Sequence, residues 1–323
     1  MSSLLRYIAR RTVQGVVTLL IVTVVIFLLF TASGSPIAQF RADPTFDRAK
    51  LAQLENSFGL NQPWYVQMGK FLWNMFSFNF GWSSFQGKPV SDVIGEALPR
   101  TLFLFGGAVI VEYAIGVVIG QYIAWKRGRV TEGGVVMSSL FFYNMPSFWI
   151  GLILLWLFAF TINKFPLGGF ADVDAMNAGG LTLAGNIIWH AALPMLALIL
   201  INAAGTILLM RTSMLEVMGE DYILTAKAKG LPERIVRRRH AARNAYLPVV
   251  TSLTISLSFS VGGAIILEQV FSYFGIGYYF LQSVLRHDNF LAGAVLFIIS
   301  LLVIFGNIIA DILYGVLDPR VRI

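Results

Sequence analysis

The sequence predicts an all-α polytopic membrane protein with six transmembrane helices and a long external segment after the first helix. Three observations predict this class. First, 57% of the 323 residues are hydrophobic and 13% are charged, whereas soluble domains are about 45–50% apolar and about 25% charged. Second, six stretches are long and apolar enough to cross a bilayer. Third, basic residues are dense in alternate connections between these stretches.

The six stretches set the predicted organisation of the chain. A membrane-crossing helix needs about 20 apolar residues, because a bilayer core is about 30 Å thick and a helix rises about 1.5 Å per residue. The stretches that qualify are 12–30, 102–124, 135–161, 190–210, 247–270 and 291–316. We therefore divide the chain into a tail with the first helix (1–30), an external segment (31–101), a five-helix core (102–316) and a C-terminal tail (317–323).

The first stretch could be read as a cleaved signal peptide, since it follows Arg6, Arg10 and Arg11 and precedes small residues at 31–35. Its apolar core of about 19 residues exceeds the 7–15 residues that are usual for a signal peptide. We expect an uncleaved signal anchor.

The basic residues predict the orientation, because Lys and Arg close to a membrane span stay in the cytoplasm. They gather before the first stretch, after the second, between the fourth and fifth, and after the sixth. Both termini are therefore expected in the cytoplasm, with the chain in the inner membrane. The net charge of +7 could instead indicate a nucleic-acid partner. No aromatic stacking face or DNA-reading motif accompanies the charge, so we expect no nucleic acid.

The external segment 31–101 has apolar residues spaced as in short amphipathic helices, with breaks at Gly59 and Pro63. Its aromatic residues could hold an apolar ligand or partner, or lie at the membrane interface, where aromatic side chains are common. This predicted aromatic cluster comprises Trp73, Phe76, Phe78, Phe80, Trp82 and Phe85.

The cytoplasmic segment 211–246 is predicted to form two helices joined by a turn. A helix over 221–229 ends at Gly230, whose backbone is permissive, and Pro232 begins a second helix over 233–245.

The end of this helical hairpin is suited to docking. Ala226, Ala228 and Gly230 have little or no side chain, so another protein surface can approach their backbone closely. The basic run nearby is explained largely by topology, although it could also contact anionic lipid or an acidic partner. That run comprises Arg234, Arg237, Arg238, Arg239 and Arg243.

These residues resemble the cytoplasmic coupling loop of permeases from binding-protein-dependent ABC importers, in the version found in the dipeptide, oligopeptide and nickel family. One position of the general importer motif differs, since Leu224 stands where an acidic residue opens that motif. Peptide-type permeases share this difference. The residues that carry the resemblance are Tyr222, Thr225, Ala226, Lys227, Ala228, Lys229, Gly230 and Leu231, followed by Arg239, His240, Ala241, Arg243, Asn244, Ala245, Leu247 and Pro248.

The resemblance extends over nearly the whole chain and is to the first, B-type, permease of a peptide importer. One position departs from the family pattern, because Phe274 stands where Pro commonly precedes a glycine pair, and the turn there is in question. The similar stretches are 58–63, 78–83, 98–102, 146–148, 268–277 and 318–320.

The resemblance implies a type I ABC importer permease fold in a chain that is not itself an enzyme. It also implies a second homologous permease, one or two ATPase subunits that bind ATP and Mg²⁺, an extracytoplasmic solute-binding protein and membrane lipid as partners. The chain itself is expected to bind no cofactor. Its sequence has no phosphate-binding loop, because Gly87-Lys88 lacks the earlier glycine and the following hydroxyl residue.

Polar residues inside membrane spans are candidates for a translocation path, because burying them in lipid is costly. Hydrogen bonding between helices is the alternative explanation for each of them. Glu268 and Asp311 lie near opposite ends of their spans, where we expect water to reach them. Gly116 and Gly120 indicate close helix packing. The path candidates are Glu112, Asn144, Asn202, Glu268, Asn307 and Asp311.

Other functions are less well supported by the sequence. Nickel or another small solute remains an alternative cargo to peptides. A secondary transporter would be expected to show an internal repeat, and an intramembrane enzyme would need a reactive cluster. We expect neither a catalytic site nor a metal site, because His190, His240 and His287 fall in separate segments and the chain has no Cys.

Overall fold

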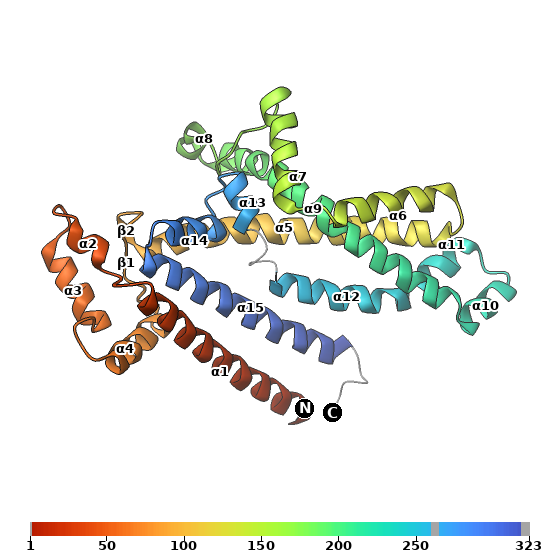
Figure 1. Ribbon diagram of the computed structural model, residues 1–323. Coiled ribbons are helices and arrows are strands. Elements are labelled where there is room, and N and C mark those ends of the chain that lie inside the picture. Colours follow the sequence, from red (N-terminus) through yellow and green to blue (C-terminus); the bar gives the residue numbers. More distant parts are fainter. Residues whose placement is uncertain (1, 260–264, 318–323) are drawn as a thin grey trace. The chain divides into compact units, whose positions relative to one another are not determined.

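The computed structural model describes the backbone of residues 2–259 and 265–317 and the side chains of residues 6–256 and 265–309. The chain divides into two compact units. Unit 1 comprises Met1–Leu102 and Val261–Ile323, and unit 2 comprises Phe103–Ser260. The described chain is helical except for its loops and one hairpin of two short strands, each of two residues (Figure 1). This agrees with the all-α class predicted from the sequence.

Four helices of the described chain are long and apolar enough to cross a membrane. They cover the first, second, fourth and sixth predicted stretches. A bent pair of helices covers the third and would make a fifth span. The four are Arg6–Ala32 within α1 (Ser2–Ala32), α5 (Val90–Trp125), α9 (Gly180–Met218) and Asn289–Ile309 within α15 (Asn289–Leu317).

The fifth predicted stretch, 247–270, begins in α12 (Ala242–Phe259) and ends in α13 (Ile265–Val270). The residues between these two helices lie outside the described chain, so this span is seen only in part. The second stretch begins earlier than predicted, since α5 starts at Val90 and includes Pro99.

The third predicted stretch is broken. Helix α6 (Val130–Tyr143) is followed by α7 (Ser147–Leu154) and a π-helical segment, η1 (Leu155–Thr161), at an angle of 102°. The break falls at Pro146, which has no N–H to continue a helix and which disfavours helical geometry at the residue before it. Asn144 ends α6 with two hydrogen bonds to one carbonyl, because both its backbone N and its Nδ2 donate to Leu140 O, at 3.3 and 2.6 Å.

In unit 1, α1 and α15 run antiparallel and pack along one another (Figure 1). The external segment then forms α2 (Ala38–Ala42), α3 (Arg48–Phe58) and α4 (Trp64–Phe76). Gly59 adopts a left-handed φ of 65° and ends α3, while Pro63 immediately precedes α4. The two amphipathic helices and their breaks, predicted from the sequence, are confirmed.

A buried carboxylate attaches the rest of the external segment to α15. The hairpin strands β1 (Trp82–Ser83) and β2 (Lys88–Pro89) follow α4. Asp288 is 2% exposed and accepts hydrogen bonds from Ser83 Oγ at 2.6 Å and Phe85 N at 3.1 Å. It also accepts from Leu291 N at 3.1 Å, which satisfies an N–H group in the first turn of α15.

A surface ion pair joins α2 to α3. Arg41 Nη2 lies 2.7 Å from Glu55 Oε1, and Asn61 also donates to this carboxylate. These hydrogen bonds, that from Arg41 first, hold the pKa of the Glu55 carboxyl below its ordinary value.

The predicted aromatic cluster of the external segment separates into two groups. Phe80 is buried, and Trp82 and Phe85 pack against the core of unit 1. Trp73, at 75% exposure, and Phe78, at 55%, remain on the surface. The buried group therefore stabilises the fold, and only the exposed group, which includes Trp73 and Phe78, is available to lipid or a partner.

In unit 2, α5 and α9 approach closely at two glycines. A Cβ atom added at Gly116 would lie 2.5 Å from Thr206 Cγ2, and one at Gly120 would lie 2.8 Å from the carbonyl oxygen of Ile207. The close packing predicted from this glycine pair is confirmed. Helix α9 also contacts α6, α7, α8 (Val173–Ala178) and α12.

We expect Gly120→Ala to destabilise unit 2, because the added methyl meets a backbone carbonyl that cannot move aside without displacing α9. Overpacking of this kind costs about 1–3 kcal/mol. Thermal unfolding of the purified protein in detergent would measure it. Gly106→Ala is the matched control, since it lies on α5 with open space around the new Cβ. Equal melting temperatures for the two variants would contradict the close contact.

Candidate functional site

The segment between α9 and α12 forms the predicted helix, turn and helix. Helix α10 (Asp221–Ala228) is followed by Gly230 with a φ of 70°. After Pro232 the chain enters α11 (Glu233–Ile235), which continues through a π-helical segment, η2 (Val236–Ala241), into α12. The second helix therefore does not end near Ala245 as predicted.

One face of α10 is directed outward. Tyr222 and Leu224 are 39% and 57% exposed, and Thr225, Lys227, Ala228, Lys229 and Gly230 are exposed as well. This surface, which we call the α10 face, combines an aromatic ring, an apolar side chain and two lysines. An exposed aromatic and apolar surface with charged surroundings is typical of protein interaction sites.

Ala226 is a correction to the predicted docking tip. It is 4% exposed and packs with Ile223 against Met210 and Met214 in the core of unit 2. Residues three apart lie on the same side of a helix, so Ala226 follows Ile223 inward. Ala226 thus anchors α10, and Leu224 takes a place on the outer face instead. Leu231 is half-buried beside the same core.

Polar contacts attach this segment to α5 and α12. Asn244 Nδ2 donates to Tyr222 Oη at 2.7 Å. Trp125, the last residue of α5, donates from Nε1 to Glu233 Oε2 at 3.4 Å, and Lys227 Nζ lies 5.8 Å from the centre of its ring. The Trp125 side chain therefore contacts both helices of the segment.

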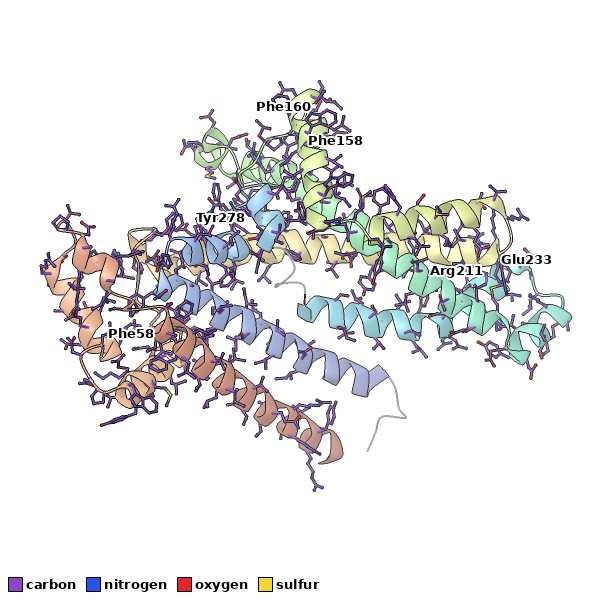
Figure 2. All side chains as sticks on the ribbon, viewed as in Figure 1. Phe58, Phe158, Phe160, Arg211, Glu233 and Tyr278 are labelled. Carbon is purple, nitrogen blue, oxygen red and sulfur yellow. The ribbon has the colours of Figure 1, made fainter. Side chains whose placement is uncertain are left out.

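A partly buried ion pair joins α6 to α9. Arg211 donates from Nε and Nη2 to Glu132 Oε1 at 2.8 and 2.5 Å, and Gly128 N donates to Glu132 Oε2 at 2.6 Å. Figure 2 shows Arg211 and Glu233 at the end of unit 2 that carries α10 and α11. The ends of α5, α6, α9 and α12 are thus joined around the α10 face.

Two of the polar residues predicted inside the membrane lie together. The side chain of Glu112 on α5 lies close to that of Asn202 on α9. Glu112 is 3% exposed, and its Oε2 has no hydrogen-bond partner among the described residues. Asn202 is exposed. This pair is consistent with both explanations considered from the sequence, a translocation path and an interhelical contact.

The other path candidates are dispersed. Asn144 is exposed at the bend between α6 and α7, and Asn307 is half-buried on α15. The side chain of Asp311 lies outside the described residues.

Glu268 is buried, and the expectation that water reaches it is wrong. It is 0% exposed. Its Oε1 accepts from Thr101 Oγ1 at 2.6 Å and its Oε2 from Tyr278 N at 2.9 Å. Thr101 Oγ1 in turn accepts from Ile276 N at 2.8 Å. The two side chains therefore cap the start of α14 (Ile276–Leu285), whose first N–H groups have no partner within the helix.

The turn before α14 differs from the family pattern as the sequence suggested. Phe274 has a φ of 53°, a conformation that Pro cannot adopt because its ring fixes φ near about −65°. A Cβ atom at Gly275 would collide with Glu268 and Thr101, so this position needs glycine. A Pro at position 274 would therefore require a different turn before α14.

Several residues at or beside the segment between α9 and α12 were not singled out from the sequence, namely Trp125, Glu132, Arg211 and Glu233. A Trp or a charged residue at the cytoplasmic end of a span is common for reasons of solvation alone, so no local signal identified them. No group of three His, Asp or Glu side chains close enough to hold a metal ion occurs in the described part of the chain.

Comparison with known proteins identifies the family of this chain. Residues 116–323 match the family described as binding-protein-dependent transport system inner membrane component, and residues 4–105 match the N-terminal family of the same components. The chain is 35% identical over 317 residues to the oligopeptide transport system permease protein AppB of Bacillus subtilis, covering 98% of this chain and 99% of that protein.

It is also 32% identical over 337 residues to the dipeptide transport system permease protein DppB of Escherichia coli, covering 99% of each chain. The match over residues 116–323 and both relatives thus include the segment between α9 and α12. The chain belongs to the family of inner-membrane components of binding-protein-dependent transport systems, and it is a multi-pass permease.

Proposed function

We propose that this permease forms half of the translocation path of an ATP-driven importer and moves di- or oligopeptides across the cytoplasmic membrane. The observation that carries the proposal is the α10 face, which is exposed, partly apolar and connected by side chains to α5 and α12. Such a surface can receive a movement from another subunit and pass it to membrane helices.

Peptides are the proposed cargo because the two relatives described above are an oligopeptide and a dipeptide permease, and each matches nearly the whole chain. Nickel or another small solute is the alternative. No metal-binding cluster among the described residues favours it, although a passing metal complex would not need one.

The proposed partners are a second homologous permease, one or two ATPase subunits that hold ATP and Mg²⁺, and an extracytoplasmic solute-binding protein. In this assembly both termini lie in the cytoplasm. The residues proposed to contact the ATPase are Tyr222, Leu224, Thr225, Lys227, Ala228, Lys229 and Gly230, with Leu231 at the edge and Ala226 as an internal anchor.

The proposed mechanism uses the coupling segment as a lever. ATP binding closes the ATPase subunits, and the α10 face makes different contacts with their open and closed forms. Only such a difference in contacts can shift a two-state equilibrium. The displacement reaches α5 through Trp125 and α12 through Asn244. The Glu112–Asn202 pair and Asn144 are proposed to line the path that opens.

The assembly can be tested by mass spectrometry of the proteins that co-purify with this chain from its native membrane in mild detergent. We expect a second, similar permease and one or two phosphate-loop ATPases. The same preparation in vesicles, with the binding protein added, should take up radiolabelled di- or oligopeptides only with ATP. Recovery of the chain alone would contradict the importer, and uptake of nickel but not of peptides would contradict the cargo.

We expect Trp125→Ala to reduce the amount of peptide moved per ATP hydrolysed, because α5 would no longer follow α10 and α11. Removing an interaction worth about 1.4 kcal/mol changes an equilibrium about tenfold. Uptake and ATP hydrolysis would be measured on the same vesicles. Trp156→Ala, at an exposed site on η1, is the matched control. Equal coupling ratios for the two variants would exclude a role for Trp125 in transmission.

A further inference from the structure

A cavity of about 300 Å³ lies within unit 1, between the end of α1, the α3–α4 connection and the start of α15. Five phenylalanines line it: Phe27, Phe30, Phe58, Phe71 and Phe290. Their rings support each other, with 5.6 Å between the centres of Phe27 and Phe71 and 4.8 Å between those of Phe58 and Phe290. Figure 2 marks Phe58 at this place in unit 1.

Three polar side chains of the lining donate hydrogen bonds within the chain. Thr31 Oγ1 donates to Phe27 O at 2.8 Å, and Gln67 Nε2 donates to Gln62 O at 2.8 Å. Asn289 Nδ2 donates to Ser33 Oγ at 3.2 Å. None of the lining residues, all of them in the described part of the chain, carries a charge. The part of a ligand that enters this cavity must therefore be apolar and uncharged.

The cavity opens where two membrane-crossing helices meet the same interface. Phe27 and Phe30 belong to the last turns of the apolar helix that ends at Ala32, and Asn289 is the first residue of the apolar helix of α15. On the same turns of α1, Leu28 and Leu29 are 52% and 58% exposed. In a membrane protein such side chains face lipid, so the lipid-facing surface of α1 continues to the cavity.

The amphipathic helix α4 indicates how deeply in the membrane the cavity lies. Its Trp73 and Phe76 are 75% and 40% exposed, and aromatic side chains are enriched at the boundary between acyl chains and headgroups. A helix with one exposed aromatic side is typical of an element that lies in the interface.

We propose that the cavity binds one acyl chain of a phospholipid from the outer leaflet. A group the size of a water molecule or a methylene occupies about 30 Å³. The cavity volume of about 300 Å³ therefore accommodates about ten methylene groups. Lipid is the occupant favoured over cargo because a peptide brings charged ends and a polar backbone, whereas five phenylalanines and no charged side chain line this cavity. The bound chain fastens α4 to α1 and α15.

The proposal can be tested by photolabelling the assembled transporter in vesicles of phosphatidylethanolamine and phosphatidylglycerol. A phospholipid with a diazirine at the end of one acyl chain serves as the probe. After proteolysis of the permease, the fragments that carry the label are identified by mass spectrometry. We expect adducts concentrated in residues 27–31 and 58–71. Thr31→Phe fills the cavity and should reduce them by about tenfold, since each buried methylene contributes strongly to acyl-chain binding.

Thr18→Phe is the matched control, because Thr18 lies on the same helix and is exposed away from the cavity. It should leave the labelling unchanged, and Ser35→Leu provides a second cavity-filling variant should Thr31→Phe fail to fold. Adducts spread evenly along α1 and unaffected by either filling variant would overturn the proposal. Labelling of the same residues by a photoreactive peptide cargo and not by the lipid would overturn it too.

Discussion

Gly230→Arg is expected to release the ATPase subunits from the purified permease and to abolish ATP-driven uptake. Gly230 lies at the turn beside the α10 face, is exposed, and has nothing within 4 Å of an added Cβ. A side chain there does not clash within the chain, although its φ of 70° adds about 1–2 kcal/mol of backbone strain. An arginine would project into the space that a docked subunit fills, where a misplaced charge costs several kcal/mol.

Gly128→Arg is the matched control for this result. Gly128 is also an exposed glycine with a positive φ, 83°, and open space around its Cβ, but it lies in the loop between α5 and α6. We expect it to retain the ATPase subunits, as measured by their ratio to permease after affinity purification. Retention of the ATPase subunits by Gly230→Arg would show that docking does not involve the α10 face, and loss in both variants would show that docking is not confined to it.

Glu268→Ala is expected to be the most destabilising substitution in unit 1. It would remove the acceptor for the buried Thr101 hydroxyl and for the N–H of Tyr278 and leave a cavity. A buried polar group left without its partner costs about 1–3 kcal/mol, so the two together imply a loss of roughly 3 kcal/mol or more. Thermal unfolding, followed by tryptophan fluorescence in detergent, would measure this loss.

Glu268→Gln keeps the shape and one oxygen acceptor, and we expect a smaller loss of stability. Glu96→Ala removes a surface carboxylate that pairs with Lys88 and should change the melting temperature little, because exposed ion pairs contribute little to stability. If Glu268→Ala melts at the temperature of Glu96→Ala, the proposed cap of α14 contributes nothing measurable.

The features predicted well from the sequence are those with a local chemical cause. Gly59 and Gly230 end helices because they adopt left-handed backbone angles, and Pro63 and Pro232 precede new ones. The membrane-crossing helices follow from apolar length alone. Each of these signals lies within a few residues of the structure it determines.

The features that the sequence did not predict depend on contacts between distant residues. The partner of Glu268 is Thr101, 167 positions away, so its place near a span end suggested water instead of burial. Ala226 lies inward instead of at the docking tip, because the inward face of α10 is determined by packing against Met210 and Met214 on another helix. The bend at Pro146 was not predicted, because apolar residues continue on both sides of it and the whole stretch was taken as one span.

The absence of cysteine from the sequence allows the docking surface to be located by cross-linking from single introduced cysteines. Ala228→Cys lies on the α10 face, and Val130→Cys, at a position 93% exposed at the start of α6, lies beyond it. With a short bifunctional reagent on the assembled transporter, we expect Ala228→Cys to give a cross-linked product with an ATPase subunit in an ATP-dependent yield, and Val130→Cys to give none. Cross-linking from Val130→Cys alone, or from neither position, would contradict the assignment of the α10 face as the coupling site.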